Sequence, residues 1–523
     1  MRQGDNNMAL GLPLTLLFLT IVGIFIAIIV ICFIAGIGTI GTGVIVSAVD
    51  KKSQVKGTKF LSRVFIILGS IILIGVIGII ISIVINIMSA VSFNKNSLIS
   101  HALSEDGYDI VKEEIANGVF VDSNYNMFKG NYPAKEGEDT PLTALCSSNK
   151  HTDVDYNIVK LLIESGADVN HIGDNGKTPI LSAAENSHHR IVALLIENGA
   201  DIYAKDANGA TVPMLESIDN GAPSESEMKY CSDNIRYLLE NGVDIKATDN
   251  DGKNILHYSL SRSGASKMID YYIKNGIDVN SPDNSGKTPL MYAAEGWEGP
   301  VLTLLENGAN INAVDNSGRT ALMYACIAGD QSELIHLFIE NGADANIADE
   351  SGKTALMYAC KNFKNEGIEV TVSELLKGNA DINKVDNEGR SAVFYLFEHW
   401  GYCDYGNKVA TILAKNGADF NIKDNNGRTP LMVLCEGKNS NDFCDIVPLI
   451  KKYGADMNAK DNNGKTALVY LADGPSPEAK EFETLLNCGA TDGVDEAYNI
   501  IKKHKYIGNL TKKEILNILE KYM

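Results

Sequence analysis

A unit of about 34 residues recurs along most of this chain. Its most regular feature is a glycine in a polar turn, and successive turn glycines are 32 to 43 residues apart. These glycines are Gly176, Gly209, Gly252, Gly286, Gly318, Gly352, Gly389, Gly427 and Gly464. Such a period is typical of a solenoid, in which each unit buries its apolar face only against its neighbours. The sequence therefore predicts a stack of like units.

One regular unit, DNSGRTALMYACIAGDQSELIHLFIENGADANIA, runs from Asp315 to Ala348. Its first four residues favour a tight turn. Thr320 is expected to cap a first helix with its hydroxyl, and several sister units place proline at the first helical position. A second helix should bury Leu334, Leu337, Phe338 and Ile339. Gly342 can adopt the left-handed conformation that ends this helix.

These units resemble the ankyrin repeat family. The family signature TPLH-x-A occurs here as TPLMYA at Thr288 and as TALMYA at Thr320 and Thr354. The resemblance covers residues 138–492, about ten repeats, and implies an all-α ankyrin-repeat solenoid of helix-turn-helix and hairpin units. Residues 94–137 are expected to form a degenerate capping repeat and a linker. Residues 493–523 are expected to form a helical cap, whose second helix would open with a capping box from Thr511 to Glu514.

Two apolar runs precede the repeats, at residues 14–36 and 64–86. Each is long enough to cross a bilayer, which needs about 20 apolar residues. A tail (1–13) comes before them and a basic loop (37–63) lies between them. We therefore predict an uncleaved hairpin of two transmembrane helices that contacts membrane lipid.

The basic loop predicts how this hairpin is oriented. Residues 50–63 hold five Lys and Arg, and such an excess in a short loop favours the cytoplasmic side. The repeats would then be extracytoplasmic on a multi-pass membrane protein. The unpaired cysteines favour the reducing cytosol instead, but burial weakens that argument.

Charge and cysteine spacing exclude several functions. The net charge is -20, and residues 94–523 alone carry -24, which disfavours nucleic acid as a partner. The nine cysteines contain no C-x-x-C pair, so they suggest neither a zinc site nor a disulfide framework. Four of them share one repeat position that is expected in the core: Cys146, Cys326, Cys360 and Cys435.

Two rows of residues are candidates for partner binding. A basic residue follows most turn glycines, and the candidate set is Lys287, Arg319, Lys353, Arg390 and Arg428. A tyrosine recurs in the first helices, and the candidate set is Tyr292, Tyr324 and Tyr358. The cations could bind an acidic segment of a protein partner, or they could pair with turn aspartates such as Asp315 and Asp424. The tyrosines could be interface anchors, or they could pack half-buried against the next repeat.

No motif indicates catalysis, a metal site or a cofactor. The pair of histidines in SHHR (187–190) is interpreted as solvated loop. Three longer stretches between helices, 220–233, 399–407 and 436–445, are either binding loops or tolerated surface insertions.

The resulting hypothesis is a membrane-anchored ankyrin-repeat scaffold for protein–protein interaction, without enzyme activity. The alternatives are an ankyrin-gated channel or transporter subunit, and a surface or secreted effector that binds host proteins. Neither the oligomeric state nor the partner can be read from the sequence.

Overall fold

The structure is a computed structural model. It describes residues 107–116, 121–126, 130–133, 138–148, 153–217, 225–260, 266–296, 298–329, 332–362, 367–398, 406–437 and 443–523. The chain divides into the units Met1–Lys95 and Asn96–Met523, and all described residues belong to the second. The predicted tail, basic loop and transmembrane hairpin lie outside the described residues. Within the described ranges, no helix combines the length and apolar character needed to span a bilayer.

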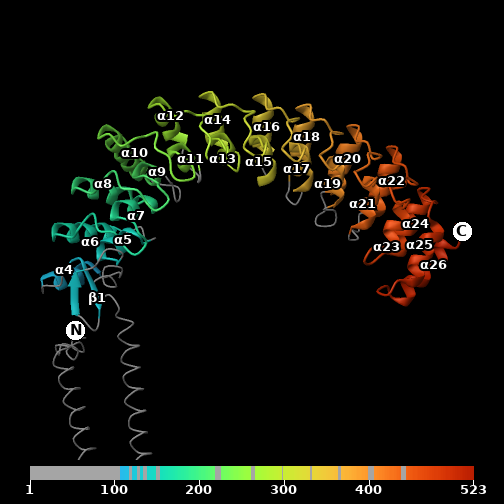
Figure 1. The fold of residues 1–523 in the computed structure, drawn as a ribbon, viewed down its shortest axis with the longest axis horizontal. Coiled ribbons are helices and arrows are strands. Elements are labelled where there is room, and N and C mark those ends of the chain that lie inside the picture. Colours follow the sequence, from blue (N-terminus) through green and yellow to red (C-terminus); the bar gives the residue numbers. More distant parts are fainter. Residues whose placement is uncertain are drawn as a thin grey trace, which may run out of the picture. The chain divides into compact units, whose positions relative to one another are not determined.

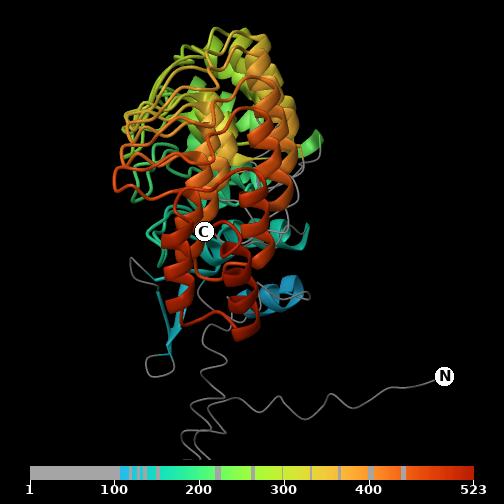
Figure 2. The same cartoon turned by 90° about the vertical axis from the view of Figure 1, so that its right-hand side faces the viewer.

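Ten helix pairs occupy the described part of residues 138–492, in agreement with the predicted repeats. The first helices are α5 (Pro141–Cys146), α7 (Pro179–Glu185), α9 (Val212–Glu216), α11 (Ile255–Ser259), α13 (Pro289–Ala293), α15 (Ala321–Ala328), α17 (Ala355–Lys361), α19 (Ala392–Glu398), α21 (Pro430–Glu436) and α23 (Ala467–Asp473). The second helices are α6 (Asp153–Glu164), α8 (His189–Glu197), α10 (Glu225–Glu240), α12 (Ser266–Lys274), α14 (Glu298–Glu306), α16 (Ser332–Glu340), α18 (Ile368–Lys377), α20 (Gly406–Lys415), α22 (Phe443–Lys452) and α24 (Ala479–Asn487). The first helices form one layer and the second helices another (Figure 1). The loops between repeats gather on one side of these layers (Figure 2).

Other elements lie at both ends of the repeats. Helix α4 (Gly107–Ala116) is followed by the strands β1 (Ser123–Asn126) and β2 (Gly130–Pro133), which pair antiparallel with Ser123 opposite Pro133. This two-stranded sheet is an addition to the predicted all-α class. After the repeats, α25 (Val494–Lys503) packs against α23, and α26 (Asn509–Leu519) packs against α24. The predicted capping box is wrong, because α26 begins two residues before Thr511 and Gly508 holds the cap position.

Local sequence explains where the helices begin and end. Thr320 caps α15 by accepting a hydrogen bond from the Met323 amide at 3.3 Å, as predicted. In three repeats the methionine that replaces the family's histidine accepts the threonine amide through its sulfur at 3.4–3.5 Å, at Met214, Met291 and Met432. Sulfur is a weak acceptor, but it keeps the same contact at the start of the helix. Gly342 has φ +86°, the left-handed conformation expected after α16.

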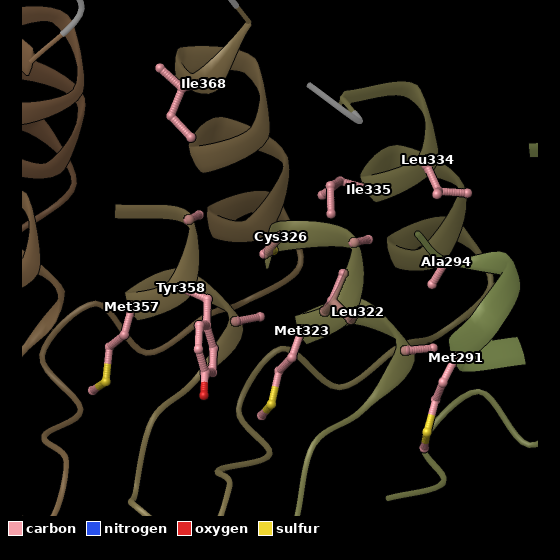
Figure 3. Close-up of a cluster of buried hydrophobic side chains, with 14 of the residues drawn as sticks. Met291, Ala294, Leu322, Met323, Cys326, Leu334, Ile335, Met357, Tyr358 and Ile368 are labelled. Atoms are coloured by element: carbon pink, nitrogen blue, oxygen red, sulfur yellow. The ribbon is translucent and has the colours of Figure 1, made fainter. Parts of the chain in front are cut away.

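The core runs continuously through the repeats. Each first helix packs against the first helix of the next repeat, from α5 to α23. Met291, Met323 and Met357 lie at the same position in successive first helices, and Leu334 and Ile335 of α16 reach the same core (Figure 3). All four cysteines predicted in the core are buried and free of disulfides: Cys146, Cys326, Cys360 and Cys435. Burial raises the pKa of the Cys360 thiol to about 12, so it stays protonated.

Asparagines connect the hairpins of neighbouring repeats. The side-chain oxygen of Asn312 accepts the Asp344 amide at 2.8 Å, and its amide group donates to the Gly342 carbonyl at 3.4 Å. The equivalent bonds recur at Asn280, Asn346, Asn383 and Asn421. Each asparagine satisfies one donor and one acceptor of the next repeat, which fixes the stacking register.

Candidate interaction surface

In most repeats a turn aspartate organises the hairpin around itself. In one repeat, Asp283 Oδ1 accepts the backbone amides of Ser285 at 2.8 Å and Lys287 at 2.9 Å. Its second oxygen, Oδ2, accepts the Tyr292 hydroxyl at 2.7 Å. The buried carboxylate therefore joins the turn to the first helix of the same repeat.

The tyrosine row makes this bond in six repeats. The hydroxyl donates to its own turn aspartate over 2.5–2.9 Å, at Tyr258, Tyr292, Tyr324, Tyr358, Tyr395 and Tyr470. Burial, and then the bond to Asp315, raise the pKa of Tyr324 to about 12. Tyr358 is buried, whereas Tyr292 and Tyr324 are half-buried. These hydroxyls act within the repeats, which agrees with the packing interpretation; a contact between the rings and a partner stays a prediction.

The basic row connects each repeat to the next. Lys287 Nζ lies 4.2 Å from the ring centre of Tyr292 and 4.3 Å from that of Tyr324 in the following repeat. Arg319 approaches Tyr358 at 5.9 Å, and Lys353 approaches Tyr395 at 5.6 Å. These separations are within the range of a cation–π contact. The cations therefore help to hold the stack together.

Most of these cations also have a carboxylate partner. The partner stands eight residues later, at the end of the first helix, in the pairs Lys177–Glu185, Lys287–Glu295, Arg390–Glu398, Arg428–Glu436 and Lys465–Asp473. Arg390 and Arg428 also pair with their turn aspartates, at 3.2 Å and 2.8 Å. The Lys287 and Arg390 side chains are only 12% and 16% exposed. Their positive charge is largely compensated inside the repeat.

Three repeats lack this carboxylate. In one of them Ser261 stands eight residues after Lys253, and Lys253 pairs with Asp251 at 3.7 Å instead. The other two repeats are adjacent. Eight residues after Arg319 the chain has Ile327, and eight residues after Lys353 it has Lys361. Among the described residues, no carboxylate lies within ion-pair distance of Arg319, Lys353 or Lys361. The Nε atom of Arg319 is buried and has no hydrogen-bond acceptor. Lys361 is exposed at the last turn of α17. We call Arg319, Lys353 and Lys361 the uncompensated cluster.

The sequence analysis predicted neither the carboxylate partners of the cations nor the repeats that lack such a partner. It placed Lys287, Arg319, Lys353, Arg390 and Arg428 in one equivalent row and considered only the turn aspartates as partners. The missing signal was the carboxylate that stands eight residues after five of the eight cations. The site assignment as a whole stays a prediction.

The interpretation of SHHR as solvated loop is wrong. His188 and His189 are 6% and 5% exposed, and His189 is the first residue of α8. The insertion at 220–233 also differs from a plain loop, because α10 begins at Glu225 and continues for 16 residues. The extra residues therefore lengthen a helix from residue 225 onward.

The sequence profile of ankyrin repeats (three copies) matches residues 87–206, 227–315, 298–386, 322–424 and 399–492. Together with the paired helices and hairpins, this match defines the class of the protein as a repeat scaffold. The chain belongs to the ankyrin repeat family. The matched region begins upstream of residue 138, where the repeats were predicted to start. No functionally curated protein is significantly similar to the chain.

Proposed function

We propose that this protein is a membrane-anchored scaffold whose repeats bind an acidic segment of another protein. The observation that carries the proposal is the uncompensated cluster. Five other repeats pair the equivalent cation with a carboxylate eight residues later, and Lys253 pairs with Asp251. Positive charge therefore remains available in the two adjacent repeats that have neither partner. Ankyrin repeats imply protein partners. The positive charge of this cluster favours a partner with an acidic segment.

The cluster suits a carboxylate for three reasons. Arg319 offers a planar guanidinium that can bind a carboxylate through two parallel hydrogen bonds. Lys353 and Lys361 add two more cations from the next repeat. The chain around them is strongly acidic, so an acidic partner is attracted mainly at this place.

Membrane anchoring rests on the sequence. The runs at 14–36 and 64–86 carry no charged side chain, and each is long enough to cross a bilayer. A scaffold held at a membrane by this hairpin would collect its partner at that surface.

Charge reversal tests the binding proposal. Affinity capture with the wild-type full chain, followed by mass spectrometry, identifies the proteins that it binds. The variant with Arg319→Glu, Lys353→Glu and Lys361→Glu is then expected to bind them at least about tenfold more weakly, because attractive pairs become repulsive. Raising the ionic strength should also weaken the binding of the wild type.

A matched variant controls for net charge. Lys451→Glu, Lys452→Glu and Lys480→Glu change the charge by the same amount at exposed positions of α22 and α24. This control is expected to bind like the wild type. Equal losses in the two variants would mean nonspecific electrostatics and would contradict an acidic-segment site at the cluster.

A further inference from the structure

Glu216 is a buried carboxylate at a position where four sister repeats have alanine, four have leucine and one has serine. It is the last residue of α9 and is fully buried. The position five residues after the capping threonine holds Ala293, Ala325 and Ala359 in other repeats. Burying an ionised carboxylate costs several kcal/mol unless nearby groups compensate it. Its surroundings must therefore supply that compensation.

Three polar residues surround Glu216. His189 Nδ1 of α8 lies 3.0 Å from Glu216 Oε1, and Asn234 Nδ2 of α10 donates to the same oxygen at 2.7 Å. Cys231 lies one turn earlier in α10. One ligand atom from each of His189, Glu216 and Cys231 lies within 4.8 Å of the other two. Among the described residues, no other group of His, Cys, Asp and Glu meets this spacing.

One oxygen atom of this cluster is left without a hydrogen bond. Glu216 Oε2 is buried and has no partner in the part of the chain that the structure describes. Buried polar atoms without partners are rare, and each one needs an explanation.

We propose that His189, Glu216 and Cys231 bind one Zn²⁺ ion, with a water molecule in the fourth position. Nitrogen, sulfur and carboxylate oxygen together form a donor set that zinc accepts. Calcium and magnesium prefer oxygen ligands alone, so the cysteine and histidine argue against them. The 3.0 Å separation of Nδ1 and Oε1 is short enough for both atoms to contact one ion.

Binding would release a proton from the cluster. The Cys231 thiol must lose its proton to become a thiolate ligand, and this proton passes to solvent. His189 would bind through Nδ1 as a neutral imidazole, with its one ring proton on Nε2. The zinc charge then compensates the thiolate and the carboxylate.

The site would be structural. Its ligands come from α8, α9 and α10, which belong to two consecutive repeats. One ion would fix the middle of the long helix α10 against α8 and α9. This inference is independent of the proposed binding function.

Metal titration of the purified full chain tests the site. After metal removal, the wild type is expected to take up one Zn²⁺ per chain, and Co²⁺ in its place should give a thiolate-to-metal charge-transfer band. Cys231→Ser should lower the affinity at least about 100-fold and abolish the band, since even residues behind the ligands can cost 10–100-fold. Cys444→Ser, at another partly exposed cysteine, should change neither.

A second variant distinguishes the loss of a metal ligand from misfolding. Glu216→Ala installs the residue that sister repeats already carry, so it should fold and yet lose zinc binding. Zinc should raise the melting temperature of the wild type and leave that of Glu216→Ala unchanged. The proposal is overturned if the wild type binds no zinc, or if Cys231→Ser and Glu216→Ala bind it as tightly as the wild type.

Discussion

At the scale of single residues, the turn aspartate and the tyrosine form one hydrogen-bonded unit in each of six repeats. Asp349 is representative: its Oδ2 accepts the Tyr358 hydroxyl at 2.6 Å, and both residues are 8% exposed. Burial alone would raise the pKa of Asp349. The hydrogen bonds from Tyr358, Ser351 and the backbone outweigh burial and lower this pKa below 3.8. The carboxylate is therefore charged at neutral pH and fully bonded.

Removing one hydroxyl tests this unit. Tyr358→Phe is expected to lower the free energy of unfolding by about 1–3 kcal/mol, because the ring stays and a buried charged acceptor loses its donor. Denaturant unfolding of the full chain measures the change. Because the folded pKa is lowered, the difference should be complete above about pH 4, the range of an unperturbed Asp, and should shrink as the pH falls through the folded pKa. Tyr453→Phe is the control, since among the described residues no group hydrogen-bonds to that hydroxyl. A Tyr358→Phe variant as stable as this control would contradict the role of the bond.

The sequence predicted residues whose role is local. Thr320 and Gly342 act through contacts within a few residues, so their types and positions suffice to predict a cap and a helix end. His189, Glu216 and Cys231 are 27 and 15 residues apart and meet only because two repeats stack. Their signal was a departure from the repeat pattern, namely a glutamate at a position that holds alanine, leucine or serine in the other repeats.

At the scale of elements, the last two helices continue the two layers of the repeats. Helix α25 follows α23 in one layer, and α26 follows α24 in the other. Ile515 and Leu519 of α26 are fully buried, whereas Leu510 is 73% exposed. The helices of the tail were predictable from its apolar spacing. The start of α26 was not, since Gly508 offers no side chain to mark it.

Weakening α26 should destabilise the C-terminal end of the stack. Ile515→Ala is expected to cost about 2–5 kcal/mol of local stability, because it leaves a cavity between α24 and α26. Since repeats contact only their neighbours, hydrogen exchange should accelerate in α23 and α24 and stay unchanged in α7 and α8. Leu510→Ala should leave both regions unchanged. Uniform acceleration along the chain would mean that the stack unfolds as one unit and would contradict nearest-neighbour coupling.

At the scale of the whole molecule, the net charge differs sharply between three segments of the chain. Residues 1–63 carry +4, residues 64–93 carry no charge, and the rest carries -24. Five of the six cations in the first segment lie between residues 50 and 63, in the loop that separates the two apolar runs. Cations in a short loop near membrane spans favour the cytoplasmic side. Both flanking segments, and therefore all repeats, are expected on the opposite side.

Protease accessibility distinguishes the two orientations. Protease added to intact cells or spheroplasts is expected to digest the repeats and to spare an epitope tag inserted between residues 50 and 63. The buried cysteines are compatible with this location, because a protonated thiol shielded from solvent, such as Cys360, oxidises slowly. As a control, the same protease should remove the tag after the membrane is lysed. Repeats that resist digestion until lysis would place them in the cytosol. The charge of the loop would then have failed to set the orientation, and the partner with the acidic segment would have to be sought among cytosolic proteins.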